Sequence, residues 1–443
     1  MSGVVSADSL QLAHVQETSP GVTPATPVFN LWRTSGESVV FAPNTSDSTE
    51  LGGDGRTQKP SNVTGTSVSG DINFELAKFP ALEEAIAGVM AAVWGECPLT
   101  GAAGGAIDSA NRITVGDDLP TFTIEKRFPN PNNTSGTMDL SASAGAPGAT
   151  VDITITGTTA VGSGVIEVSI AQDGNPADVF SSPITPGDDA DAAATALAAV
   201  IDADANWGAS AVAGVVTVTP IGTTVSSVAA AAGKDEYYYQ RYRGCSYSVM
   251  NLTTAPNETV TGSFSVVGGA PELSSLPVAG ATYNTAGSGA VFTAPEVLAI
   301  NLGPSIGVLT SCFNSLTINL DSQNRGIPCI GTSGDREVVT GLLLATVSGE
   351  VYFTNQLALE SMLANEVIGD GDIVFSNADD DVYRFDFFGL KVTSGQVAAG
   401  GTGQDVTVPL EFQPTPVEVC DDGGSIWTSG LIVSLVNTAP TLP

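Results

Sequence analysis

Basic residues and histidine are scarce in this chain. It has 14 Lys and Arg against 47 Asp and Glu, a formal net charge of −33 at pH 7, and a single histidine, His14. Proteins that hold nucleic acid by neutralising its phosphates need clustered Lys and Arg side chains. The composition therefore excludes tight nucleic-acid binding of this kind, and it predicts repulsion from DNA and from anionic membranes.

The residue types that build catalytic centres are also few. A Ser-His-Asp or Cys-His site would have to be assembled around His14, because no other histidine exists. The sequence contains no nucleophile elbow of the G-x-S-x-G type, no phosphate-binding G-x-x-x-x-G-K-[ST] loop and no dinucleotide-binding fingerprint. We therefore expect no enzymatic activity and no cofactor.

Metal ligands in a recognisable spacing are missing as well. One histidine and scattered cysteines argue against a zinc site. Three acidic clusters could suggest calcium, namely 369-GDGD-372, 379-DDD-381 and 420-CDDGG-424. None has the alternating acid spacing of a calcium loop that ends in glutamate, and each lies between predicted strands. Because Asp and Gly favour turns, we interpret the clusters as turns and expect no metal.

Long apolar runs and paired cysteines are absent from the sequence. The first twenty residues contain no basic segment followed by an apolar one, and no run of eighteen apolar residues occurs. These features predict a protein with no secretory signal and no membrane span. The cysteines show no C-x-x-C spacing, which predicts reduced thiols in a cytosol. They are Cys97, Cys245, Cys312, Cys329 and Cys420.

Alternation of apolar and polar residues is what the sequence does contain. It predicts strands, each with one dry and one wet face. The stretches are 71–76, 122–125, 246–249, 259–266, 316–320, 347–353, 383–387 and 406–412. Helices are predicted over 80–94, with Pro80 in the first turn and Gly95 at the end, and over 355–366, with Asn355 as cap. The fold class is mainly β, a sandwich or barrel with a flanking helix.

A change of composition marks an inserted segment at 140–235. It carries ten acids and one base, and it reads as strands at 151–155 and 166–170, a helix at 188–203 and a hairpin around Gly214. We interpret it as a small inserted domain, of β-α-β or immunoglobulin-like type. The main domain would then comprise residues 1–139 and 236–443, the second part including a C-terminal segment.

Two polar stretches interrupt the alternating pattern of the main domain. Residues 1–30 contain three prolines and few periodic apolar positions, which predicts an N-terminal arm. Residues 43–62 are rich in Asn, Thr, Ser and Gly, which predicts a long loop. Loops of that length are usually functional or disordered, and such segments often become ordered on assembly.

The order of these segments resembles that of a known family. A strand and helix in 71-DINFELAKFPALEEAIAGVMAAVWG-95, a strand in 121-TFTIEKRF-128 and the stretch 238-YYQRYRGCSYSVMNLTTAPNETVTGSFSVVGG-269 are similar to bacteriophage major tail proteins, the tail tube subunits. The later segments 315–325, 336–353, 381–395 and 405–414 continue the pattern. The resemblance covers about residues 60–128 and 237–436.

The resemblance implies a structural subunit of the virion tail, assembled in the host cytoplasm. Such subunits form stacked hexameric rings, whose sheets join edge to edge into one barrel around a lumen through which DNA passes without tight binding. Ring-to-ring contacts would come from the arm at 1–30 and the loop at 43–62. The implied partners are further copies of the chain and the tape-measure, tail-terminator and baseplate or tail-tip proteins.

An acidic lumen would let DNA slide without sticking, because tight binding needs basic residues. Acids on the wet faces of the predicted strands are therefore candidates to line the lumen, and the alternative is that they lie on the outer wall. They are Asp71, Glu75, Glu125, Glu350 and Asp386. Two other functions remain open from the residues alone: a tail fibre, baseplate or adhesin-type binding protein, and a secreted β-sandwich hydrolase. Self-assembly would discriminate among them.

Overall fold

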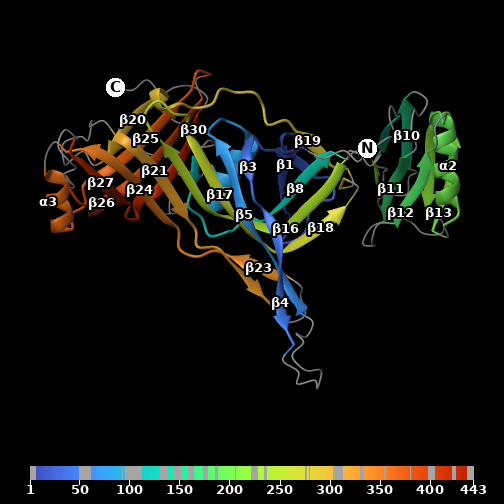
Figure 1. The fold of residues 1–443 in the computed structure, drawn as a ribbon, viewed down its shortest axis with the longest axis horizontal. Coiled ribbons are helices and arrows are strands. Elements are labelled where there is room, and N and C mark those ends of the chain that lie inside the picture. The colour runs from blue at the N-terminus through green and yellow to red at the C-terminus, as the bar shows by residue number, and fades with distance from the viewer. Residues whose placement is uncertain are drawn as a thin grey trace, which may run out of the picture. The chain divides into compact units, whose positions relative to one another are not determined.

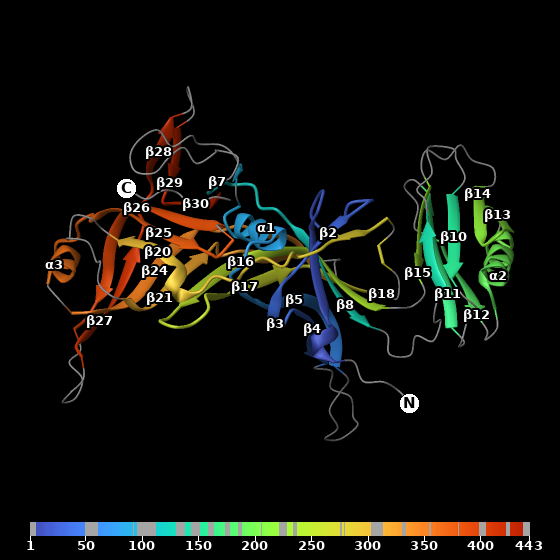
Figure 2. The same ribbon diagram turned by 90° about the horizontal axis from the view of Figure 1, so that it is seen from above.

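The computed structural model of this 443-residue chain describes most of its residues. The described residues are 6–48, 61–91, 93–94, 112–129, 138–142, 151–157, 164–172, 178–184, 188–204, 206–220, 228–233, 237–274, 277–278, 280–302, 313–329, 334–353, 356–379, 381–397, 405–421 and 426–436. Strands predominate among them (Figures 1 and 2). None of their helices has the length and apolar character that crossing a membrane would require.

The chain divides into two compact units, each considered by itself. Unit 1 comprises residues 1–31, 123–243 and 271–285, and unit 2 comprises 32–122, 244–270 and 286–443. The strand β16 (Tyr237–Thr254) supplies residues to both.

Unit 2 is built on one long antiparallel sheet. Neighbouring strands in it follow the order β4, β5, β17, β16, β21, β24, β27 and β26. A short strand, β3, also pairs with β5. The bounds are β3 Thr34–Glu37, β4 Val40–Asp47, β5 Ser61–Glu75, β17 Thr261–Gly268, β21 Phe313–Asp321, β24 Leu344–Tyr352, β26 Val382–Gly395 and β27 Thr407–Gln413.

A second run of antiparallel strands in unit 2 shares β26 with the first. Its order is β20, β25, β26, β30, β7 and β6. The bounds are β6 Val93–Trp94, β7 Arg112–Thr114, β20 Val297–Leu302, β25 Gly369–Ser376 and β30 Leu431–Val436. Two separate hairpins pair β22 (Arg325–Pro328) with β23 (Asp335–Val339), and β28 (Val417–Asp421) with β29 (Ile426–Ser429).

The core of unit 2 follows from period-two alternation along its strands. In β5, Ile72 and Phe74 are buried while the residues between them are exposed. Aromatic rings concentrate around Trp32, whose ring centroid lies 5.8 Å from that of Phe264 and 5.7 Å from that of Phe79. The mainly β fold predicted from alternation is confirmed.

The two helices of unit 2 are shorter than the sequence predicts. The first, α1, spans Pro80–Val89, because Ala91 takes a left-handed backbone conformation (φ 45°) and Val93 belongs to β6. Pro80 does occupy the first turn, as expected. The second, α3, spans Leu357–Ala364, and its predicted cap Asn355 lies outside the described residues.

Unit 1 contains a sheet portion formed by β1 (Gln11–Gln16), β2 (Val28–Leu31) and β19 (Thr282–Asn284). β1 pairs antiparallel and β19 parallel with β2. β8 (Phe122–Pro129) and β18 (Ala270–Ser274) both pair with β16. A small core cluster of Ala13, Val15 and Phe29 holds β1 and β2 together.

The segment predicted as an arm therefore contains two strands, β1 and β2. Residues 12–15 are all buried, so β1 has no wet face and shows no alternation that sequence analysis could detect. The loop predicted at 43–62 also overlaps strands, because β4 extends to Asp47 and β5 begins at Ser61. All eight residues of β4 are exposed, which again leaves no alternation.

In the remaining part of unit 1, the described residues between 138 and 233 form seven strands and one helix. A four-stranded sheet has the order β13, β14, β10, β9, and a three-stranded sheet has the order β12, β11, β15. The helix α2 (Ala190–Asp202) begins where the Asp189 carboxylate accepts a hydrogen bond from the Ala192 amide at 2.9 Å. The bounds of the strands are β9 Met138–Ala142, β10 Val151–Gly157, β11 Gly164–Gln172, β12 Asp178–Ile184, β13 Trp207–Val212, β14 Val215–Pro220 and β15 Val228–Gly233.

These seven strands and α2 enclose a core of their own. Trp207 is a fully buried member of this core, and its Nε1 donates a hydrogen bond to the Asp178 carboxylate at 2.8 Å. The predicted strands at 151–155 and 166–170, the helix and the hairpin at Gly214 (φ 76°) are present. Three further strands, β9, β12 and β15, were not predicted. The domain boundaries at 140 and 235 stay a prediction.

Candidate functional site: a polar sheet face

One face of the long sheet in unit 2 is polar from β5 to β27. Its residues lie opposite each other in successive ladders: Asp71 faces Ser265, Ser263 faces Asn251, and Asn251 faces Asn319. The alternate residues of the same strands form the core. We call this surface the polar face, and it consists of Asp71, Asn73, Glu75, Asn251, Thr253, Thr261, Ser263, Ser265, Thr317, Asn319, Asp321, Thr346, Ser348, Glu350 and Glu411.

Hydrogen bonds across the ladders order the side chains of the polar face. The Ser265 hydroxyl donates to Asp71 Oδ1 at 2.7 Å, and Asn319 Nδ2 donates to Asn251 Oδ1 at 2.5 Å. Directly opposite residues in an antiparallel ladder are close enough for such contacts. Hydrogen bonds therefore join side chains of the polar face between neighbouring strands.

Glu350 is held as a carboxylate on this face. Thr407 Oγ1 donates to its Oε1 at 2.6 Å, and Asn314 Nδ2 donates to its Oε2 at 2.9 Å. These two hydrogen bonds, the one from Thr407 first, lower the pKa of Glu350 below its usual value, because they favour the charged form. Glu350 therefore stays ionised at neutral pH.

The charge of the polar face has a single sign. It carries five acids and no base: in the described residues of β5, β17, β21, β24 and β27, and in residues 249–254 of β16, no Lys or Arg occurs. Like charges in a confined space repel an anionic polymer, and this repulsion weakens as salt screens it. The five acids are Asp71, Glu75, Asp321, Glu350 and Glu411.

Three of the five predicted candidates belong to this face. Asp71 and Glu75 are exposed on β5, and Glu350 is partly exposed on β24. Sequence analysis missed Asp321 and Glu411, although Glu411 lies in the polar phase of the strand predicted at 406–412 and Asp321 is the next polar position after the strand predicted at 316–320. Extending each alternation by its own phase would have found them.

Glu125 does not lie on a wet face, and that prediction was wrong. It is fully buried in unit 1, where its carboxylate accepts a hydrogen bond from Arg241 Nε at 2.6 Å and one from the Tyr283 hydroxyl at 2.6 Å. The residues of β8 from Phe122 to Lys126 are all buried. Both faces of this strand are covered. The alternation of apolar and polar residues along it therefore does not distinguish buried from exposed positions.

Asp386 was placed on a wet face for the same reason, and it too is buried, at 7% exposure. Its Oδ1 atom accepts from Arg384 Nε at 2.7 Å. β26 pairs with β25 and with β30 around this position, and most of its residues are buried on both faces. Asp386 therefore makes an ion pair that is largely buried.

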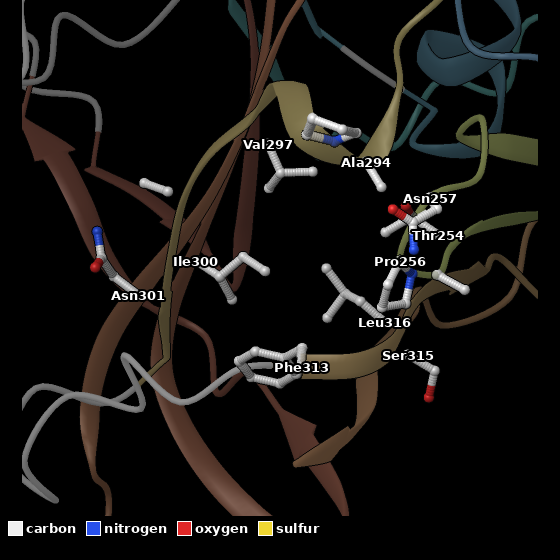
Figure 3. A pocket seen from close by; sticks show the side chains of 13 residues that line it. Thr254, Pro256, Asn257, Ala294, Val297, Ile300, Asn301, Phe313, Ser315 and Leu316 are labelled. Carbon is white, nitrogen blue, oxygen red and sulfur yellow. The ribbon is translucent and has the colours of Figure 1, made fainter. Parts of the chain in front are cut away.

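A pocket of about 580 Å³ lies elsewhere in unit 2, between the end of β16 and the start of β20 and β21 (Figure 3). Phe313, Ile300 and Val297 project toward it, and its polar lining comes from residues such as Thr254 and Asn257. No acidic or basic side chain lines it. The pocket therefore provides no group for acid–base chemistry.

The fold is mainly β, and one face of its long sheet carries acids and no base from β5 to β27. Comparison with protein families gives a match to the family described as phage tail tube protein, in two overlapping regions, residues 8–228 and 159–414. The match covers most of the chain, so this chain belongs to the phage tail tube protein family. It is a structural protein of the phage tail, part of the virion, and not an enzyme. No curated protein matches the chain.

Proposed function

We propose that the chain assembles into stacked hexameric rings that form the tail tube, the conduit for DNA delivery into the host. The observation that supports this most strongly is the polar face, which carries only acids from β5 to β27 of the long sheet of unit 2. The registers of the described strands pair β4 with β5 alone, and a strand with one unpaired edge can pair with a further copy of the chain. Tape-measure, tail-terminator and baseplate or tail-tip proteins would bind the finished tube, and residues 140–235 would form an outer decoration domain.

The polar face would line the lumen of this tube. Its opposite side is packed into the core, so the polar face is the side of the sheet left to meet solvent or passing DNA. Asp71, Glu75 and Glu350 would then face the DNA phosphates. Repulsion keeps the DNA from adhering, because adhesion to phosphates requires Lys and Arg.

The β4–β5 hairpin and the N-terminal residues 1–30 would make contacts between stacked rings. In Figure 1 the hairpin extends away from the other strands of unit 2. All of β4 is exposed, and Val63 on β5 is 66% exposed. An exposed strand pair of this kind is suited to burial against a neighbouring copy.

Assembly is tested by electron microscopy of the purified full chain at high concentration. We expect hollow tubes of uniform bore. A variant lacking residues 43–62 should fold, since Val63–Thr66 can close the turn between Ala42 and Ser67, which pair in the native ladder. It should form no tubes. Normal tube growth by this variant would remove the hairpin from the ring contacts, and solid fibres from the unaltered chain would contradict the proposed function.

Charge reversal on the polar face tests the lumen assignment. Phage carrying Asp71→Lys with Glu350→Lys should eject DNA several-fold more slowly at low salt, because every ring would present Lys to the phosphates, and raised salt should restore the rate. Asp152→Lys with Asp202→Lys makes the same charge change on exposed residues of the 138–233 segment and should leave ejection unchanged. Equal rates in the two double variants would place the polar face outside the lumen.

A further inference from the structure

The long sheet of unit 2 contains the same arrangement twice. The first copy consists of β3 with β4, then β5, α1, β16 and β17 in chain order, with β6–β15 between α1 and β16. The second copy consists of β21, β24, α3, β26 and β27 in chain order, with β22 and β23 between β21 and β24 and with β25 between α3 and β26. In both copies four residues separate the second strand from the helix, 76–79 and 353–356.

The first ladder has the same register in both copies. β3 meets β5 with a bulge between Thr34 and Gly36, opposite Phe74 and Asn73. β21 meets β24 with a bulge at the corresponding place, between Phe313 and Ser315 and opposite Val351 and Glu350. Bulges are specific features of a fold, so their coincidence is strong evidence of a common plan.

The next ladder repeats as closely. β16 meets β17 with a bulge between Tyr247 and Val249, and β26 meets β27 with a bulge between Val392 and Ser394. In each copy a glycine with positive φ lies two residues before that ladder begins.

These glycines are Gly244, with φ 68°, and Gly389, with φ 56°. A positive φ strains residues with a Cβ, so this turn needs glycine in both copies. The two copies therefore share ladder registers, bulges and a backbone conformation.

Within one chain the two copies are joined by a strand pairing. Residues Val249–Thr254 of β16 in the first copy pair with Leu316–Asp321 of β21 in the second. The apolar residues at this joint are buried: Leu252 is 2% exposed, and Leu320 is 0% exposed. The joint shows how one copy of this arrangement binds another.

The equivalent surfaces at the two outer ends of the sheet are exposed. The counterpart of β21 is β3–β4, and the registers of the described strands give β4 one partner, β5. Ser394 and Gly395 of β26, where the counterpart of the β16 joint begins, pair with β27. Phe41, which corresponds to Leu320, is 39% exposed, and Val397, which corresponds to Leu252, is 37% exposed. Apolar residues exposed on sheet edges mark places where another strand binds.

We infer that the chain is a tandem repeat of one tube module, and that the β3–β4 edge of a second copy of this chain pairs with the end of β26 as β21 pairs with β16. In that register Phe41 lies opposite Gly395 and Val40 lies opposite Gln396. The inference rests on the proposed tube and refines its ring, in which the six positions are occupied by modules and not by six separate chains. Each chain supplies two of the six positions in a ring, so three chains close it.

The insertion between β8 and β16 has no equivalent between β25 and β26, so each ring carries three inserts.

Disulfide cross-linking in assembled tubes tests the joint and the number of chains together. Val40 and Gln396 correspond to Asn319 and Asn251, which lie directly opposite each other across the internal joint. A variant with Val40→Cys and Gln396→Cys should therefore form a disulfide between neighbouring chains. On a denaturing gel without reductant, the products should increase to three chains and stop. Reductant should return them to single chains.

The controls are the two single variants and the pair Val63→Cys with Gln396→Cys, which joins no predicted neighbours and should give no ladder. Products that continue to six chains, or a Val40–Gln396 variant that assembles without cross-linking, would overturn the inference while leaving the tube function intact. Failure of the unaltered chain to form any tube would instead reject the proposed function, and this inference with it.

A proline variant provides a second, independent measurement. The Ser38 amide donates to the Asp71 carbonyl at 2.8 Å, so by alternation the Phe41 amide points away from β5, toward the open edge. Phe41→Pro should therefore preserve the monomer and its melting temperature but abolish ring formation. Tube formation at the normal rate by Phe41→Pro would overturn the proposed pairing.

Discussion

Replacing Glu125 with Gln should lower the free energy of unfolding by about 3–5 kcal/mol, the usual effect of leaving one partner of a buried ion pair without its counter-charge. Arg241 is 2% exposed and its guanidinium Nε lies 2.6 Å from Glu125, which is 0% exposed. Glu272, the other carboxylate near Arg241, is 36% exposed and therefore compensates the buried charge less well. Urea denaturation of the full chain measures the change.

The neighbouring ion pair provides the control for Glu125→Gln. Arg243 lies against the same Glu272, but both side chains are more than a third exposed. Arg243→Ala should therefore change the free energy of unfolding by about 0–1 kcal/mol. Similar losses in the two variants would show that burial does not determine the strength of the Glu125–Arg241 pair.

The Tyr283 hydroxyl reports on the same site. Burial, then the charge of Glu125 and its hydrogen bond, raise the pKa of Tyr283 well above its usual value. Glu125→Gln removes the negative charge, so the pKa of Tyr283 should fall toward that of a free tyrosine. Spectrophotometric titration of tyrosine would detect the shift alongside the loss of stability.

Trp32→Ala should destabilise unit 2 by a comparable amount, about 3–5 kcal/mol, because it opens a cavity that the surrounding rings cannot fill. Trp32 is 6% exposed, and the centroids of Phe79, Phe264 and Tyr247 lie 5.7, 5.8 and 6.0 Å from its ring. These rings come from three separate segments of the chain, so the tryptophan joins elements that are distant in sequence. Thermal and urea unfolding would measure the loss.

Phe353→Ala is the matched control for Trp32→Ala. Phe353 is also aromatic but is 38% exposed, so its removal should cost about 1 kcal/mol or less. Equal losses would mean that the ring cluster around Trp32 adds nothing beyond the burial of a single apolar surface.

Local patterns were sufficient for the class of fold and for part of the site. Strand phases at β5 and β24 placed Asp71, Glu75 and Glu350 correctly on the polar side, because each strand has one buried and one open face. Pro80 marked the start of α1 correctly, since its fixed φ and missing amide suit a first turn. The order of these segments was also enough to suggest the tail tube family.

In strands where alternation does not indicate burial, only the tertiary structure showed which residues are buried. A strand covered on both sides, such as β8 or the first half of β26, buries its polar residues too, so Glu125 and Asp386 became interior partners of arginines. A strand exposed on both sides, such as β4, shows no apolar phase at all.

The proposed repeat rests on the strand ladders, because the two sets of strands share registers and bulges. The sequence by itself determined which residues alternate and that bases are too few to hold DNA. Which faces are covered, and which edges stay open for another copy, depends on contacts between segments far apart in the chain.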